Sequence, residues 1–311
     1  MPRWARSSIL TLKMNSRGHL LTELRNPDSM RLDELSIADA VAVMNKHDRL
    51  AIEAVQKVRD QVVRAIEMVT FALKQGGRLI YAGAGTSGRL GVLDASECPP
   101  TFRTDPEQVQ GIIAGGKEAM FVAQEGAEDS PEGGARAMDE KNVGANDVVM
   151  GIATGGTTPF VHGALRHARA RGAKTIFLSC VQPVENEPEV DLVIRPLTGP
   201  EVLTGSTRLK AGTATKLVLN QVTTLSMVQL GKVYENLMVD LRATNLKLWD
   251  RGARIIGMLT DLPRDEAMDL LKRADGHVKV AIVMHNRGVP REQALELLNH
   301  ADGWLRRAVE G

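Results

Sequence analysis

Apolar residues along the chain form short continuous runs, typical of buried strands, and longer segments with the period of a helix. The order of these segments predicts the order of the strands and helices. Segments of helical period stand between several short apolar runs, and such alternation indicates a parallel sheet covered on both faces. The runs with the length and residue types of buried strands are 78–83, 110–113, 147–153, 174–179 and 191–195. The helical segments between them are notably 88–97, 117–126 and 158–171. We therefore predict an α/β fold, a parallel-sheet α/β/α sandwich.

Helices are also predicted before the first strand and after the last. Ser36 and Asp39 have the spacing of a capping box, which predicts the start of a short helix. Apolar residues then recur at steps of three and four over 52–73, and two glycines at 76–77 end this long helix. A second long helix is expected over 209–230.

The pattern changes again near the end of the chain. Shorter helical segments are predicted at 264–274, 277–285 and 291–309, with Pro290 as a stop between the last two. We expect a small all-helical domain at 256–311, after a main domain at 14–255. Residues 1–13 are too polar and their apolar patch too short for a signal sequence, so we expect a disordered extension there.

Composition narrows the classes of partner and the compartment. The formal net charge of +1 gives no electrostatic case for binding nucleic acid or an anionic membrane. No apolar run approaches the ~20 residues that span a bilayer. The two cysteines, Cys98 and Cys180, lack metal-ligand spacing, so we expect reduced thiols in a cytoplasmic protein.

The glycine-rich turn after the first predicted strand is the most informative local feature. Strand, turn and helix start bring backbone N–H groups and the helix dipole to one point, which makes an anion site. The spacing Gly83-x-Gly85-x-x-Gly88 also fits the dinucleotide-binding pattern. Thr86 and Ser87 at its tip, and the lack of a suitable acidic residue about 20 positions on, favour a phosphate monoester on a small molecule instead.

Similar turns rich in hydroxyl groups recur twice more along the chain. Each turn by itself is most simply a capped helix start, because serine and threonine favour that position. Three such turns, two of them directly after apolar strands, favour a shared sugar-phosphate pocket. The turns are 85–88, 154–158 and 205–208.

Two carboxylates could serve as proton carriers near these turns. Glu97 ends the helix that the first turn opens, and a buried carboxylate there would suit a general acid or base. Glu128 could supply a second one. The alternatives are a solvated residue at a helix end for Glu97 and a helix-start acid favoured by the dipole for Glu128. Spacing alone leaves both possibilities open.

His162 and His167 raise the question of a metal site. They are five positions apart on one predicted helix, so they point roughly 140° apart and cannot share a face. No other ligand cluster is evident in the sequence. We therefore expect no metal.

At this point the residues resemble a specific family. The turn 83–89 and the segment 90–102 after it are similar to those of the N-acetylmuramic acid 6-phosphate etherases, which belong to the sugar isomerase (SIS) superfamily. The resemblance runs from about residue 15 to the end of the chain and includes a helical tail. Further matching segments are 21–26, 113–116, 126–129, 199–214, 231–240 and 245–248.

The resemblance implies a lyase that releases D-lactate from the C3 ether of the sugar by elimination and then water addition. It implies Glu97 as the acid that protonates lactate and Glu128 as the base, with one carboxyl protonated and the other ionised. It implies no metal or redox cofactor, and a homodimer whose pocket takes residues from both subunits. The implied substrate-binding residues are Gly85, Thr86, Ser87, Gly88, Arg89, Thr154, Thr157, Thr158, Ser206, Thr207 and Lys210.

One departure from the family leaves the phosphate contacts open. The family's second turn often reads Ala-Ser-Gly-Arg-Thr-Pro, whereas here Gly155 replaces the serine and Thr157 the arginine. Threonine hydroxyls remain, so phosphate binding is still expected. The alternative function is a non-catalytic sugar-phosphate sensor, similar to the glucokinase regulatory protein, which would need neither Glu97 nor Glu128. An aldose–ketose phosphate isomerase would share the pocket but not that pair.

Overall fold

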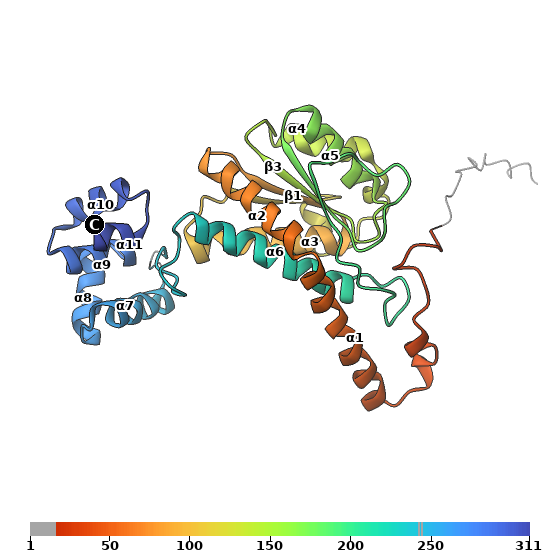
Figure 1. Ribbon diagram of the computed structural model, residues 1–311, viewed down its shortest axis with the longest axis horizontal. Helices are drawn as coiled ribbons and strands as arrows, with labels where there is room; N and C mark the ends of the chain where they lie inside the picture. Colours follow the sequence, from red (N-terminus) through yellow and green to blue (C-terminus); the bar gives the residue numbers. More distant parts are fainter. Residues whose placement is uncertain (1–16, 242, 244) are drawn as a thin grey trace, which may run out of the picture.

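The computed structural model describes residues 17–241, 243 and 245–311 (Figure 1). The extension expected at 1–13 lies outside these residues. A five-stranded parallel sheet with the order β2-β1-β3-β4-β5 forms the centre of the main domain. All five expected strands are confirmed, as β1 (Leu79–Gly83), β2 (Val109–Ile113), β3 (Val148–Ile152), β4 (Lys174–Leu178) and β5 (Leu192–Ile194).

Helices cover both faces of the sheet, so the predicted sandwich is confirmed (Figure 1). One face carries α4 (Pro131–Glu140) and α5 (Pro159–Ala170). The other carries α2 (Arg59–Lys74) and α3 (Gly85–Phe102), with α6 (Lys210–Gln229) packed against both.

The sheet register determines where the loops after the strands lie. Gly83, the last residue of β1, is level with Ile113 of β2 on one side and Ile152 of β3 on the other. The turn that enters α3 and the turn that enters α5 therefore begin next to each other, at the carboxyl edge of the sheet. Ligands of open parallel sheets bind at this edge.

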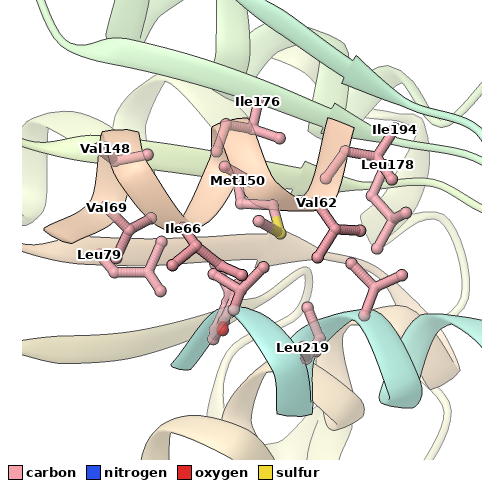
Figure 2. Close-up of a cluster of buried hydrophobic side chains, with 14 of the residues drawn as sticks. Val62, Ile66, Val69, Leu79, Val148, Met150, Ile176, Leu178, Ile194 and Leu219 are labelled. Carbon is pink, nitrogen blue, oxygen red and sulfur yellow. The ribbon is translucent and has the colours of Figure 1, made fainter. Parts of the chain in front are cut away.

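The core explains the nearly continuous apolar runs of the strands. Leu79 contributes to the cluster on the α2 and α6 side, whereas its neighbour Ile80 contributes to the cluster on the α4 and α5 side. Both are fully buried. Figure 2 shows the first cluster, in which Val62 of α2 and Leu219 of α6 lie against the strand side chains. With both faces covered, the strand side chains are mostly apolar on both sides of the sheet.

The helices before β1 differ from the prediction in where one helix ends and the next begins. The Ser36 hydroxyl accepts a hydrogen bond from the amide of Asp39 (3.1 Å), so the predicted cap is confirmed, but the helix that it opens, α1 (Ile37–Lys57), is long. Val58, with φ −105° and ψ 19°, separates α1 from α2, so the single helix expected over 52–73 is wrong. The first turns of α1 extend away from the sheet (Figure 1) and leave Ile37 86% exposed.

Two expectations between β1 and β3 are also corrected. The segment 117–126 is not an α-helix but the short 3₁₀ helix η3 (Lys117–Met120) followed by turns, and Gly126 at φ 75° leads into the 3₁₀ helix η4 (Ala127–Asp129). Helix α3 does not end at Glu97 but continues through two prolines to Phe102. Phe102 is buried in the core, and this packing offsets the loss of backbone hydrogen bonds at the prolines.

The tail is helical, as expected. It consists of α7 (Leu246–Thr260), α8 (Arg264–Arg273), α9 (Val278–Arg287), α10 (Arg291–His300) and α11 (Leu305–Glu310). The single helix expected over 291–309 is interrupted by Gly303 at φ 77°. The expected boundary at 255/256 falls inside α7, and the apolar cluster of the tail begins at Val239. Across residues 17–241, 243 and 245–311, no helix is long and apolar enough to span a membrane.

Candidate functional site

The first turn places an uncapped helix start at the carboxyl end of β1. Helix α3 begins at Gly85, whose φ of 51° favours glycine, and its N-cap residue Ala84 offers no side-chain hydrogen bond. Of the two hydroxyl residues, Ser87 is buried and Thr86 half-buried. The first amides of α3 therefore lack a side-chain acceptor, and a phosphate oxygen could take that place.

The second turn, 154–158, has the same character and is held from behind by a histidine. Thr158, the N-cap residue of α5, makes no side-chain capping bond. The His162 ring nitrogen Nε2 donates to the carbonyl oxygen of Gly156 at 2.8 Å. Burial lowers the pKa of His162, which keeps its imidazole neutral. His167 instead bonds Asp139 at 2.8 Å, so the two histidines have different partners, as their spacing predicts.

The third turn differs, because a protein carboxylate already occupies the start of α6. The Glu201 side chain is fully buried and accepts hydrogen bonds from the backbone amides of Lys210 (3.0 Å) and Ala211 (2.9 Å). Burial raises the pKa of Glu201, while the two amide bonds act in the opposite direction. The helix starts that remain open to an anion are those of the first and second turns.

Lys210 lies inside a buried polar network rather than on an open surface. Its side chain is 1% exposed, and its ammonium donates to the carbonyl oxygen of Pro200 at 2.7 Å. The ammonium also lies 3.3 Å from Nδ1 of His47, whose Nε2 bonds Asp28 at 3.0 Å. Burial lowers the pKa of Lys210. This network joins the third turn to α1 and to the segment before it, with Asn26 bonding both His47 and Pro200.

A cavity of about 310 Å³ opens between the first turns of α3 and α6. Among the expected substrate-binding residues, Thr86 lines it. Arg89 instead donates to the carbonyl oxygen of Met120 at 2.9 Å and so ties α3 to η3. Ser206 and Thr207 are half-buried in the turn just before α6. The full lining is Thr86, Leu90, Arg208, Gly212, Thr213, Lys216 and Leu217.

A buried carboxylate behind this cavity was missed by the sequence analysis. Asp94 of α3 is 4% exposed; it accepts a hydrogen bond from the Tyr81 hydroxyl (2.9 Å) and pairs with the ammonium of Lys216 (2.7 Å). Burial and the nearby Asp94 charge raise the pKa of Cys98 to about 12, so this thiol stays protonated and is no nucleophile. The available signal was an aspartate on the inward side of a helix packed against a strand.

The two expected proton carriers lie on different elements, and both are exposed. Glu97 projects from the same side of α3 as Thr86 and Leu90, about three turns from the helix start, which is a rise of about 16 Å. Glu128 lies on η4, which packs against α5. Within the described part of a single protomer, the two carboxylates are therefore not unequally buried, as they would have to be for burial to keep one protonated and the other ionised.

The chain is similar to known proteins over most of its length. A family model described as the glucokinase regulatory protein N-terminal SIS domain matches residues 61–169. The N-acetylmuramic acid 6-phosphate etherase of Gloeothece citriformis is 55% identical over 276 residues, covering 89% of this chain and 90% of that protein. The etherase of Salinibacter ruber is 51% identical over 312 residues, covering 100% of this chain and 99% of that protein. The chain belongs to the N-acetylmuramic acid 6-phosphate etherase family. The solved structure of a phosphoheptose isomerase from Neisseria gonorrhoeae has 16% sequence identity and a TM-score of 0.44, over 60% of this chain and 99% of that one.

Gly155, the position at which the second turn is expected to depart from the family's usual sequence, lies close to Thr22. A Cβ atom at Gly155 would lie 4.0 Å from the hydroxyl oxygen of Thr22, which is fully buried and has no hydrogen-bond partner among the described residues. The neighbouring carbonyl oxygen of Thr22 accepts from the amide of Gly205 (3.3 Å). The segment around Thr22 therefore lies between the second and third turns, and a serine at 155 would approach its hydroxyl.

Proposed function

We propose that this protein cleaves the D-lactyl ether of N-acetylmuramic acid 6-phosphate, giving N-acetylglucosamine 6-phosphate and D-lactate. The observation that carries the proposal is identity of more than half along nearly the whole chain with proteins of that name. Two uncapped helix starts side by side at the carboxyl edge of the sheet support a phosphate ligand.

The phosphate is assigned to the first two turns. Backbone amides and hydroxyls of Gly85, Thr86, Ser87 and Gly88 would bind it, together with the hydroxyls of Thr154, Thr157 and Thr158. Ser206 and Thr207 of the third turn would contact the sugar. Arg89, whose Nε donates to the carbonyl oxygen of Met120, and Lys210, whose ammonium donates to that of Pro200, would support these turns from behind.

The reaction follows from the acidity of the proton on C2 of the open-chain aldehyde. Glu128 removes this proton, a double bond forms between C2 and C3, and the C3–oxygen bond breaks as Glu97 protonates the departing lactate. Glu97 then takes a proton from water, whose oxygen adds to C3, and C2 regains a proton. One water is consumed and no net oxidation occurs, so this sequence requires no redox cofactor.

We also propose that the working form is a homodimer. Glu97 and Glu128 are exposed in one protomer, whereas acid–base catalysis requires one of them to be held protonated. Large apolar side chains lie exposed close to this side, including Leu93, which is 45% exposed one turn before Glu97, and Leu225 of α6 at 44%. A second copy would cover them and bury the carboxylates unequally. A monomer by light scattering at micromolar concentration would contradict this.

The reducing cytoplasm is the compartment that we propose. Both cysteines are free and buried, and burial raises the pKa of Cys180 to about 12, as it does for Cys98. Two unpaired thiols are typical of proteins kept under reducing conditions.

The test is incubation of the purified protein with N-acetylmuramic acid 6-phosphate in H₂¹⁸O. D-lactate together with ¹⁸O at C3 of the sugar is the expected result; fragmentation distinguishes C3 from exchange at C1. Glu97→Gln and Glu128→Gln should each lower the rate by about 100- to 10,000-fold. Glu125→Gln, at an exposed glutamate of the same segment as Glu128, is the matched control and should retain activity.

A sugar-phosphate sensor is the second candidate, favoured by the match of residues 61–169 to the regulatory-protein model. Bound sugar phosphate without any release of lactate would support the sensor and refute the etherase. Release of lactate without ¹⁸O at C3 would instead refute the elimination and hydration steps.

A further inference from the structure

The cavity between α3 and α6 has two cations and no carboxylate among its lining residues. Arg208 and Lys216 supply the positive charges, and Thr86 and Thr213 supply hydroxyl groups. Leu90 and Leu217 complete the wall. A volume of about 310 Å³ is at the lower end of small-molecule sites. The lining therefore suits a compact ligand that carries negative charge.

Lys216 is the better fixed of the two cations. Its ammonium pairs at 2.7 Å with Asp94, which is 4% exposed and also accepts the Tyr81 hydroxyl at 2.9 Å. An ammonium group has three donors, and Asp94 is its acceptor among the described residues, so donors remain for a ligand. Lys216 is still partly open to solvent, with 29% of its side chain exposed.

The proposed substrate carries two anionic groups. Its phosphate is assigned to the first two turns, and the carboxylate of its lactyl group needs a separate partner. Asp94, which holds Lys216, precedes Glu97 by one turn of α3, a rise of about 4.5 Å. In the lactyl ether a single carbon separates the ether oxygen from the carboxylate. The cation that Asp94 holds and the carboxyl group of Glu97 thus come from positions one turn apart on α3, which fits neighbouring groups of the same leaving group.

We propose that Lys216, positioned by Asp94 and Tyr81, binds the lactyl carboxylate of the substrate. This subsite rests on the proposed function, since it assigns the second charge of that substrate. It distinguishes N-acetylmuramic acid 6-phosphate from sugar phosphates that lack the carboxylate. It also retains lactate during elimination, while Glu97 supplies the proton to the ether oxygen.

The experiment compares the substrate with its lactamide, in which an uncharged amide replaces the carboxylate. The value of kcat/KM is measured for both compounds with the wild-type protein and with Lys216→Met. The inhibition constant of N-acetylglucosamine 6-phosphate reports phosphate and sugar binding separately, since this compound lacks the lactyl group. Lys174→Met is the matched control, because Lys174 pairs with Asp191 at 3.0 Å but does not line the cavity.

Loss of one charged hydrogen bond predicts a wild-type preference of about 10- to 100-fold for the carboxylate over the amide. Lys216→Met should bring this ratio close to one while the inhibition constant stays at its wild-type value. Lys174→Met should keep the full ratio. Asp94→Asn, which loosens Lys216 without removing it, should lower the ratio in part and leave the inhibition constant unchanged.

Several results would overturn the subsite. Equal kcat/KM values of the wild-type protein for the substrate and its lactamide would already overturn it. A folded Lys216→Met variant that keeps the preference for the carboxylate over the amide would also overturn it. The same holds for a variant in which binding of the substrate and of N-acetylglucosamine 6-phosphate weakens equally. If Arg208→Gln abolishes the preference and Lys216→Met does not, Arg208 is the partner. Should Lys216→Met fail to fold, Lys216→Gln, whose amide can still donate to Asp94, replaces it. No lactate from either compound would refute the proposed function itself.

Discussion

Gly88 is the position where the packing of α3 on the sheet and the proposed phosphate site both depend on the absence of a side chain. A Cβ atom there would lie 2.7 Å from Cγ1 of Ile113 and 2.8 Å from the carbonyl oxygen of Gly83. Ordinary contacts of a Cβ begin at 3.4 Å, so each gap is short by more than half an ångström. Ile113 is buried, and the Gly83 carbonyl is held by the amide of Ala114 at 2.9 Å. The relief available is a shift of α3 away from β1.

Gly88→Ala should therefore destabilise the protein despite the helix propensity of alanine. Forcing a methyl group into a packed site costs about 1–3 kcal/mol, whereas replacing glycine by alanine inside a helix gains about 1 kcal/mol. The net expectation is a loss of up to about 2 kcal/mol, because the steric cost at two fixed neighbours offsets or exceeds the gain in helix propensity. Since the first turn of α3 moves with the helix, KM for the sugar phosphate should rise as well.

Urea unfolding followed by far-UV circular dichroism measures the stability, and release of D-lactate measures KM. Gly144→Ala is the matched control, because no atom lies within 4 Å of its Cβ position and its φ is not in the left-handed region. That variant should be as stable as wild type and fully active. A Gly88→Ala protein with wild-type stability and KM would show that α3 does not need this close approach, and the reasoning would fail.

Three further predictions concern the surroundings of the site and the tail. Because burial lowers the pKa of His162, the unfolded chain binds a proton that the folded protein does not, so stability should fall as pH drops below about 6.5. Urea titrations at several pH values measure this loss, and a His162→Gln variant should lack the part of it that His162 causes. Lys279→Met removes a buried ammonium that donates to the carbonyl oxygens of Gly231 (2.9 Å) and Gly303 (2.8 Å) and pairs with Asp240 (3.2 Å). This variant should cost about 1–3 kcal/mol in the same assay, and an unchanged midpoint would contradict a stabilising role for these contacts. Gly155→Ser places a hydroxyl near that of Thr22, which has no hydrogen-bond partner among the described residues. The lower backbone entropy of the unfolded chain alone should raise stability by about 0.4–1 kcal/mol. Destabilisation in the urea assay would mean that the turn needs glycine.

The sheet could be predicted from sequence because its strands are buried on both faces. Each run is largely apolar, which leaves little doubt about a parallel arrangement once helices stand between the runs. The break at Val58 could not be found in this way. Apolar residues continue at helical spacing across it, and the break is seen only in the structure, where α1 and α2 both pack against α6.

Residues that line the cavity could be predicted from sequence where one local segment carries them, but not where distant segments meet. Thr86 belongs to a glycine-rich turn whose residues are consecutive, so the pattern was visible. The buried network is formed by Tyr81 of a strand and by Asp94 and Lys216 of two different helices. The two residues of its ion pair, Asp94 and Lys216, are 122 positions apart in the sequence. A single sequence has no periodic signal for such a contact. What it does contain is a polar residue on a buried helix face, and such a residue requires a partner.

The three turns rich in hydroxyl groups have similar sequences but different roles in the fold. Helices α3 and α5 begin without a side-chain cap, whereas α6 begins on the two carboxylate oxygens of Glu201. An anion and a buried glutamate satisfy the same helix start, so one excludes the other. The turn before α6 is thereby fixed by the protein itself, so that Arg208 in this turn and Lys216 in α6 have constant positions beside the cavity. The first two turns leave their amides without a side-chain acceptor, as the proposed phosphate site requires, so one repeated pattern can supply both a ligand site and its support.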